Sequence, residues 1–330
     1  MDLSLFWFAL IVGATLMYIL MDGFDLGIGV LFAVIHKNTD RDVMVNSVAP
    51  VWDGNETWLV MGGAALFGAF PAAYALVAEA LTIPLTVMLL GLIFRGVAFE
   101  FRFNAAPRHR RFWDNAFFAG SVVATFAQGV VVGAVVQGIN PGDVDAWGWL
   151  TPFTLFCGVG LMAAYGLLGA TWLVLKCSGP LQARIRRITV FTLAGLLFFI
   201  VAVSVWTLQL RPAIAARWFS WPGTCALIVI PVMVALISIR LWRTLFRESH
   251  VRHPFLMALG LVFLGFAGLG ISLWPYIIPP TLTLWQAAAP LSSQRFMLPG
   301  ALFILPVILA YTGWSYWVFR GKVQQGEGWH

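Results

Sequence analysis

The chain has 330 residues, of which 60% are hydrophobic and only 10% are charged, and its mean hydropathy is +0.87. A soluble domain carries about 25% charged residues, so this composition excludes a soluble globular protein and indicates a polytopic membrane protein. The net charge of +6 is small and scattered along the chain, which argues against a nucleic-acid partner.

Nine apolar runs are long enough to span a bilayer, which takes about 20 residues in a helix. They cover residues 4–33, 50–70, 74–99, 115–137, 151–175, 188–210, 223–243, 255–278 and 298–319. The sequence therefore predicts an all-α, polytopic integral membrane protein with about nine transmembrane helices. Because no basic residue precedes the first run, we expect a retained helix and not a cleaved signal. The short turn at Pro71 predicts that the second and third helices are adjacent and antiparallel.

Lysine and arginine are divided unevenly between the two sides of the predicted membrane. Most of them fall in the odd-numbered connections and the C-terminal segment, whereas the even-numbered connections hold only Arg211, Arg217 and Arg295. The positive-inside rule then places the N-terminus outside and the C-terminus in the cytoplasm. We expect one transmembrane domain, with a helical bundle over about 1–137, further helices over about 151–320 and a short cytoplasmic tail at 321–330.

Two acidic pairs lie in or beside the first two apolar runs. Asp22 and Asp25 are three residues apart and share a helix face, and so do Asp53 and Glu56. An ionisable group at bilayer depth costs several kcal/mol, roughly 2.5–3.5 on insertion scales, so such groups usually have a function. The predicted topology puts both pairs near the cytoplasmic face.

The third run ends near the same face with Arg95, Glu100 and Arg102. Carboxylates at this depth pair with cations, face a hydrated cavity or take up protons. One interpretation is a proton-uptake path that opens to the cytoplasm. The other is a structural ion-pair cluster, such as Glu100 with Arg95 or Arg102, that locks helices one to three together. The spacing alone favours neither. Glu79, near the outer end of the third run, is interpreted as a rim residue or a subunit contact.

The histidines give no indication of a buried metal centre. His36, His109, His250, His253 and His330 all fall in predicted cytoplasmic loops or in the tail. Because a buried haem or copper usually needs an imidazole at depth, we predict no transmembrane metal held by histidine. The 10 methionines are interpreted as apolar filler. The three cysteines are far apart, which predicts neither a disulfide framework nor a thiolate metal site.

Two further patterns concern packing. The pairs Gly23/Gly27 and Gly129/Gly133 have the four-residue spacing that allows close contact between helices. The segment 274–290 is punctuated by proline and low in charge. It predicts an ordered cap on the outer surface or against a partner.

Four segments of the chain resemble subunit II of the cytochrome bd-type quinol oxidases. They are MDGFDLGIGVLF (21–32), NSVAPVWDGNETWLVMGGAALFGAFP (46–71), LIFRGVAFEFR (92–102) and the C-terminal stretch from 274 to 321. DGFDLG together with WDGNETW is specific, so chance is a poor explanation. The similarity is clear at both ends and weaker between about 115 and 255. The C-terminal block is more similar to the cyanide-insensitive branch.

The resemblance implies an electrogenic, non-pumping complex of the bacterial cytoplasmic (inner) membrane that oxidises ubiquinol or menaquinol and reduces oxygen to water. In this family, subunit I carries two b haems, haem d and the quinol-oxidising loop. Subunit II ligates no haem and folds as two four-helix bundles plus one peripheral helix. The implied partners are the haem-bearing subunit I, membrane lipid and a small single-helix accessory subunit. Some members hold a structural quinone on subunit II.

The resemblance also bears on the acidic residues. The inner aspartate of the family's WDG motif corresponds to Asp53, which favours the proton path over the ion-pair lock. Glu100 stands where the family also has an acidic residue, so it is a candidate for the point at which protons enter. The predicted proton-pathway residues are Asp22, Asp25, Asp53, Glu56 and Glu100, and the predicted charge partners are Arg95 and Arg102.

A proton-coupled secondary transporter is the alternative from another functional class. Such a protein would have interrupted helices near the membrane midplane at corresponding places in two repeats. The glycine-rich break at 23–29 has no clear counterpart in the second half of the chain, which counts against this alternative.

Overall fold

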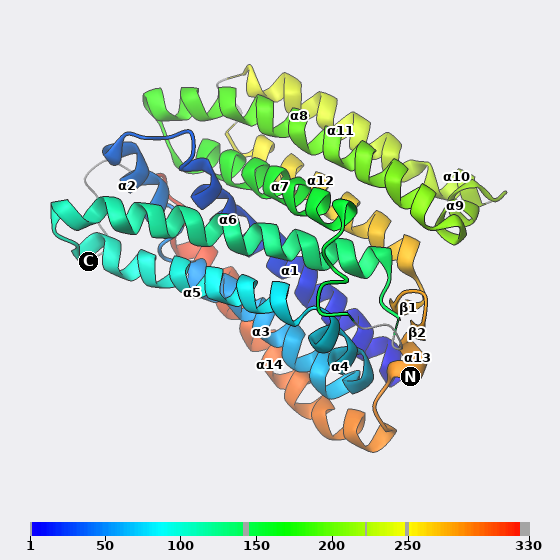
Figure 1. Ribbon diagram of the computed structural model, residues 1–330. Helices are drawn as coiled ribbons and strands as arrows, with labels where there is room; N and C mark the ends of the chain where they lie inside the picture. Colours follow the sequence, from blue (N-terminus) through cyan, green and yellow to red (C-terminus); the bar gives the residue numbers. More distant parts are fainter. Residues whose placement is uncertain (1, 141–144, 222, 248–250, 324–330) are drawn as a thin grey trace.

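The computed structural model describes residues 2–140, 145–221, 223–247 and 251–323. Long helices dominate this part of the chain (Figure 1). They are α1 (Leu3–Leu31), α3 (Trp52–Ala69), α5 (Thr82–Asn104), α6 (Pro107–Gln137), α7 (Pro152–Lys176), α8 (Gly179–Leu210), α11 (Val229–Leu245), α12 (His253–Leu273) and α14 (Leu291–Val318). The shorter helices are α2 (Asn38–Asn46), α4 (Pro71–Ala80), α9 (Pro212–Phe219), α10 (Gly223–Leu227) and α13 (Leu284–Ala287).

Eight helices in the described ranges are long and apolar enough to cross a bilayer, and α3 with α4 forms a bent ninth candidate. The predicted all-α, multi-pass membrane architecture is confirmed. We call α1, α3, α5 and α6 the first group and α7, α8, α11 and α12 the second, although α7 packs on α1 and α6 as extensively as on α8. The groups meet where α7 lies against α1 and α6, and α14 lies at the edge against α3.

The predicted direct connection between the second and third spans at Pro71 is wrong. Pro71 begins α4, a ten-residue helix that is bent by 118° from α3. Proline suits this first helical position, where its missing N–H would have no partner within the helix. Helix α5 then begins at Thr82 and packs mainly on α6. It meets α3 through side chains, as where Trp52 stacks on Phe99 with ring centroids 5.2 Å apart.

The segment after α12 forms the predicted ordered cap. The helix ends at Leu273, five residues before the end of the predicted run, and two short antiparallel strands follow, β1 (Tyr276–Ile278) and β2 (Leu282–Thr283). The backbone N–H of Ile139 donates to Pro279 O at 3.2 Å, and the N–H of Ala289 donates to Ala69 O at 2.8 Å. These bonds tie the segment over the ends of α6 and α3.

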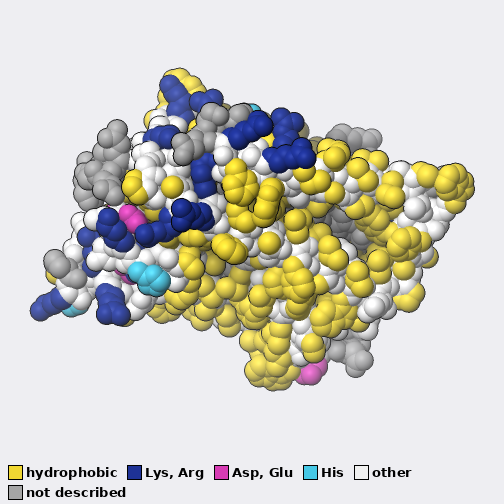
Figure 2. All heavy atoms as spheres, turned by 90° about the horizontal axis from the view of Figure 1, so that it is seen from above, with side chains coloured by type: hydrophobic (Ala, Val, Ile, Leu, Met, Phe, Trp, Pro, Cys, Tyr) yellow, Lys and Arg dark blue, Asp and Glu magenta, His cyan; other side chains and the backbone are white. Residues whose placement is uncertain are grey.

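Lysine and arginine gather at the opposite end of the molecule, which we call the basic end. It carries α2 and the connections α5–α6, α7–α8 and α11–α12. Figure 2 shows the dark blue side chains concentrated there, whereas hydrophobic side chains cover most of the remaining visible surface.

Glycine lets helices from the two groups cross in close contact. A Cβ atom on Gly27 would overlap the carbonyl oxygen of Tyr165, and one on Gly169 would lie 2.6 Å from the carbonyl carbon of Gly27. A Cβ on Gly129 would lie 2.6 Å from the carbonyl oxygen of Cys157. Both predicted glycine pairs therefore mark close helix contacts.

Replacing Gly27 with alanine should strongly destabilise the protein, because the methyl group would push against the backbone of α7. Overpacking of this kind typically costs about 1–3 kcal/mol, and more where the obstructing atom belongs to the backbone. We expect a lower thermal unfolding midpoint in detergent than for Gly13→Ala, because Gly13 has open space at its Cβ position on the same helix. Equal midpoints for the two variants would contradict the close crossing.

Candidate functional site

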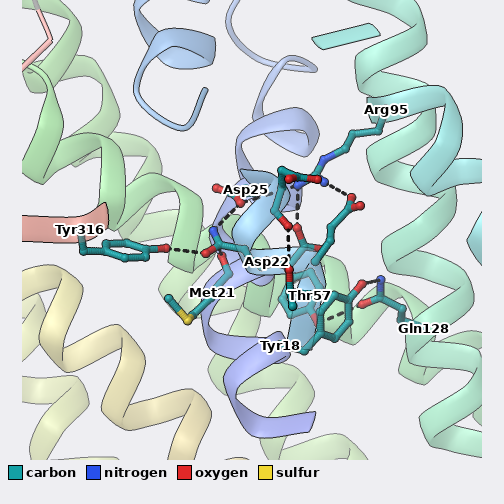
Figure 3. Close-up of polar contacts among 12 residues, drawn as sticks. Tyr18, Met21, Asp22, Asp25, Thr57, Arg95, Gln128 and Tyr316 are labelled. Atoms are coloured by element: carbon teal, nitrogen blue, oxygen red, sulfur yellow. Dashed lines mark hydrogen bonds and ion pairs between the residues drawn. The ribbon is translucent and has the colours of Figure 1, made fainter. Parts of the chain in front are cut away.

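The structure brings four of the predicted residues together, and Figure 3 labels three of them, Asp22, Asp25 and Arg95. Arg95 Nη2 lies 2.7 Å from Asp22 Oδ1 and 3.7 Å from Asp25 Oδ2. Arg95 Nη1 contacts Glu56 Oε1. We call Asp22, Asp25, Glu56 and Arg95 the Arg95 cluster. It joins α1, α3 and α5, as the sequence predicts.

Helix geometry and aromatic packing hold these side chains in place. Asp22 and Asp25 lie one turn apart on α1 and therefore share a face. The guanidinium of Arg95 lies 5.6 Å from the ring of Trp52 and 5.8 Å from that of Phe99. Since these two rings also stack on each other, they form an apolar wall that fixes the arginine and attracts its charge.

Burial separates the members of the cluster into inner and outer groups. The side chains of Asp22, Asp25 and Arg95 are 0% exposed, whereas that of Glu56 is 26% exposed. Glu56 is therefore the member that links the buried carboxylates to the surface of the chain. Three carboxylates surround one guanidinium, so a fully ionised cluster would leave two negative charges without a cation in the cluster itself.

The inner carboxylates also keep unused hydrogen-bonding capacity. Asp22 Oδ2 and Asp25 Oδ1 have no hydrogen-bond partner among the residues that the structure describes. An unsatisfied buried oxygen is costly, and a bound proton or an ordered water would satisfy it. The cluster is thus chemically suited to hold a proton or to connect with water.

Asn55 and Tyr316 extend the cluster towards α14. Asn55 Nδ2 donates to Asp25 Oδ2 at 2.7 Å, and the hydroxyl of Tyr316 donates to Asn55 Oδ1 at 2.8 Å. Asn55 is buried at 1% exposure. Neither residue was predicted from the sequence, although Asn55 lies inside the WDGNETW motif and its polar side chain is as unusual in an apolar helix as those of its acidic neighbours.

A second polar chain lies one turn away, between α1, α6 and α7. Gln128 Nε2 donates to the hydroxyl of Tyr18 at 2.6 Å, and the hydroxyl of Tyr165 donates to Gln128 Oε1 at 3.0 Å. All three side chains are buried. Gln128 was not predicted as part of a polar site, although an amide in the middle of an apolar run is itself unusual.

Two predicted residues lie apart from the cluster. Asp53, one turn before Glu56, is on an exposed face of α3, and Glu100 is on an exposed face of α5. In the described part of the chain, neither carboxylate forms an ion pair. The suggested pairing of Glu100 with Arg95 or Arg102 is therefore wrong. Glu79 is exposed on α4, near the opposite end of the molecule.

Arg102 belongs to a separate ion-pair network. Its Nε lies 2.6 Å from Asp114 Oδ1 and its Nη2 lies 2.8 Å from Asp42 Oδ1. Arg110 also reaches Asp42 at 2.8 Å, and Arg41 reaches Asp114 at 3.1 Å. These five residues connect α2, α5 and α6 at the basic end. They form an ion-pair lock of the predicted kind, but with other acidic partners.

The structure offers no arrangement of metal ligands within the residues it describes. No group of three or more His, Cys, Asp or Glu side chains there is placed to hold a metal ion. His36, His109 and His253 lie at the basic end, and His250 and His330 fall outside the described residues. A largely apolar pocket of about 610 Å³ lies between α1 and α12, lined among others by Phe8, Phe263 and Arg217.

Comparisons with known proteins identify the family of the chain. A family model described as cytochrome bd terminal oxidase subunit II matches residues 3–319. The chain is 29% identical to cytochrome bd-I ubiquinol oxidase subunit 2 of Escherichia coli (strain K12), covering 98% of this chain and 96% of that protein. It is also 29% identical to cytochrome bd ubiquinol oxidase subunit 2 of Bacillus subtilis (strain 168), with 97% of each chain covered.

A solved structure shares the fold. The bd oxidase of Geobacillus thermodenitrificans contains a chain that matches with a TM-score of 0.76 at 16% sequence identity, covering 96% of this chain and 99% of that one. The family match extends over nearly the whole length, including every helix that builds the Arg95 cluster and the ion-pair lock. The chain therefore belongs to the cytochrome bd terminal oxidase subunit II family.

Proposed function

We propose that this chain is the haem-free subunit of a bacterial complex that oxidises ubiquinol and reduces oxygen to water, and that it conducts protons from the cytoplasm towards a haem-bearing subunit I. Its relatives in Escherichia coli and Bacillus subtilis are named as subunits of ubiquinol oxidases, which supports the reaction. The concentration of lysine and arginine at the basic end supports a cytoplasmic position for that end, with the N-terminus on the periplasmic side.

The Arg95 cluster is the observation that carries the proton role. Oxygen reduction consumes protons, and an apolar membrane interior conducts them only through ionisable groups or water. Here two carboxylates are completely buried next to one guanidinium, and a third reaches the surface. Because uncompensated charge is costly in a buried site, such a cluster favours binding protons from outside and passing them on.

The positions of the carboxylates suggest an order for the transfer. Asp53 and Glu100 are exposed near the basic end and would collect protons there. Glu56 is half-buried one turn after Asp53, and it would pass protons to the buried pair of Asp22 and Asp25. Arg95 would hold the three inner carboxylates within reach of each other.

The Asp53→Asn variant tests the outer part of this route. Removing a carboxylate that collects protons should slow oxygen consumption by the assembled complex, while the haem spectrum stays largely unchanged because no haem ligand is touched. The purified variant complex is compared with wild type over a range of pH. Wild-type oxygen consumption at every pH would refute the role of Asp53. Loss of haem or of subunit I would assign the residue to assembly instead.

The pocket between α1 and α12 is where we would place the structural quinone that some members of the family hold on this subunit. It is mostly apolar, which suits a quinone ring with its isoprenoid tail. Arg217 Nη1, which donates to Ile271 O at 2.7 Å, gives its rim a polar group. The single-helix accessory subunit stays a prediction.

No observation favours a transporter. The bend between α3 and α4 lies at the end of α3 opposite to Glu56, so it provides no unwound segment beside the buried carboxylates. The family to which the chain belongs is that of a terminal oxidase.

A further inference from the structure

We propose that the pocket between α11 and α12 at the basic end binds the phosphate headgroup of an anionic phospholipid. The pocket has a volume of about 440 Å³ and is distinct from the Arg95 cluster and from the pocket beside α1. Its lining residues are Leu236, Ile239, Arg240, Arg243, Thr244, Arg247, His253 and Met257. Only the assignment to the cytoplasmic leaflet rests on the orientation proposed above.

Three arginines line this pocket, and none of its described lining residues is acidic. Arg240, Arg243 and Arg247 follow at intervals of three and four residues, so they lie on one side of α11 and its C-terminal end. All three are exposed, and none forms an ion pair with a described residue. Like charges at this spacing repel each other, so an external anion with several oxygens would stabilise the arrangement.

The backbone around the pocket is also arranged for an anion. Helix α12 begins at His253, so the positive end of its dipole lies beside the pocket. The C-terminal end of α11 would disfavour an anion, but a cation already binds two of the carbonyl groups there. Arg186, which is buried, donates from Nη1 to Leu245 O and Arg247 O at 3.2 Å each. Arg186 thereby fixes the backbone from which the lining arginines extend.

The other side of the pocket is apolar, which favours a lipid over a free phosphate. Leu236 and Ile239 precede the arginines on α11, and Met257 lies one turn into α12. The pocket is therefore basic at the end of the helices and apolar towards their middle. A phospholipid has the same sequence of properties, with a phosphate followed by acyl chains. Basic pockets between transmembrane helices on the cytoplasmic side are typical sites for anionic headgroups.

Lipid binding to the assembled, delipidated complex tests this site. Native mass spectrometry would measure the binding of phosphatidylglycerol and of phosphatidylcholine to wild type and to the double variant Arg240→Gln/Arg243→Gln. We expect wild type to prefer phosphatidylglycerol. The variant should bind it about 10- to 30-fold more weakly, because two arginines are lost and each one near an anionic lipid contributes roughly three- to five-fold to the affinity. The variant should fold, since both side chains are exposed.

The control is Arg108→Gln/Arg111→Gln, which removes the same charge from exposed positions on α6 at the basic end. It should bind phosphatidylglycerol like wild type. Equal losses in the two double variants would show general surface attraction and overturn the proposal, as would equal binding of the two lipids by wild type. If inorganic phosphate displaced phosphatidylglycerol at similar concentrations, the acyl chains would contribute nothing and a lipid site would be excluded. Oxygen consumption is not the readout, so failure here leaves the proton route untouched.

Discussion

Replacing Arg95 with methionine is expected to prevent the recovery of a stable complex. Methionine has a similar length, but it removes the guanidinium that contacts Asp22, Asp25 and Glu56. Breaking a buried ion pair by removing one partner typically costs about 3–5 kcal/mol. Proteins are usually stable by only about 5–15 kcal/mol, so the loss should be visible as a large fall in yield and in the thermal unfolding midpoint.

The control for this experiment is Arg111→Met, at an exposed position on α6, which should behave like wild type. A triple variant separates charge from shape: Arg95→Met combined with Asp22→Asn and Glu56→Gln removes two of the carboxylates that were left unpaired. We expect it to recover part of the lost stability. If Arg95→Met and Arg111→Met unfolded at the same temperature, the electrostatic role of the cluster would be disproved.

Replacing Glu56 with glutamine should produce a folded complex with slow turnover. Glutamine keeps the size of the side chain, and its carbonyl oxygen can still accept a hydrogen bond from Arg95. It cannot bind and release a proton, so the link between the surface and the buried aspartates would be lost. Proton transfer by a positioned side chain typically contributes about 100-fold or more, and bypass through water would reduce the effect; we therefore expect oxygen consumption to fall at least about tenfold.

The matched variant is Glu79→Gln, an exposed glutamate on α4 near the opposite end of the molecule. It should leave oxygen consumption unchanged. Haem spectra and unfolding midpoints of both variants would show whether the complex is intact. A Glu56→Gln complex that consumes oxygen as fast as wild type would contradict the route, and one that lacks haem would show that Glu56 serves assembly.

The depth of the buried carboxylates could be predicted from the sequence because they interrupt apolar runs whose direction follows from the charge distribution. Asp22, Asp25 and Arg95 therefore lie at one depth and in contact in the structure, as the sequence indicated. The exposure of Asp53 could not be predicted. Glu56, three residues later on α3, faces inward together with Asn55. Which face of α3 points inward is set by its packing against α1 and α14, where Trp58 is buried at 1% exposure.

The hydrogen-bond partners of the Arg95 cluster could not be predicted from the spacing of residues along the chain. Tyr316 and Asn55 are 261 residues apart, and only the docking of α14 on α3 brings them together. Arg102 was assigned to the wrong partners for a similar reason. Its partner Asp42 lies on α2, a short polar helix that falls between the first two predicted apolar runs and was not predicted.

The long helices were predictable from apolar length alone, but the path between them was not. Hydrophobicity continues through α3, α4 and α5. The sequence therefore did not indicate that α4 is bent by 118° from α3, or that α5 begins as a separate helix at Thr82. The cap after α12 was indicated by its prolines. Its contacts with the ends of α3 and α6 are backbone hydrogen bonds, which do not depend on the type of residue and so could not be predicted from the sequence.

Proton uptake during a single turnover measures the role of the Arg95 cluster most directly. The fully reduced complex is mixed with oxygen in a weakly buffered solution that contains a pH-sensitive dye, and haem absorption is followed at the same time. We predict that the Glu56→Gln complex binds oxygen as fast as wild type but takes up protons about tenfold more slowly, or slower still. Proton uptake at the wild-type rate in this complex would show that protons reach the oxygen chemistry without passing through the buried carboxylates of this subunit.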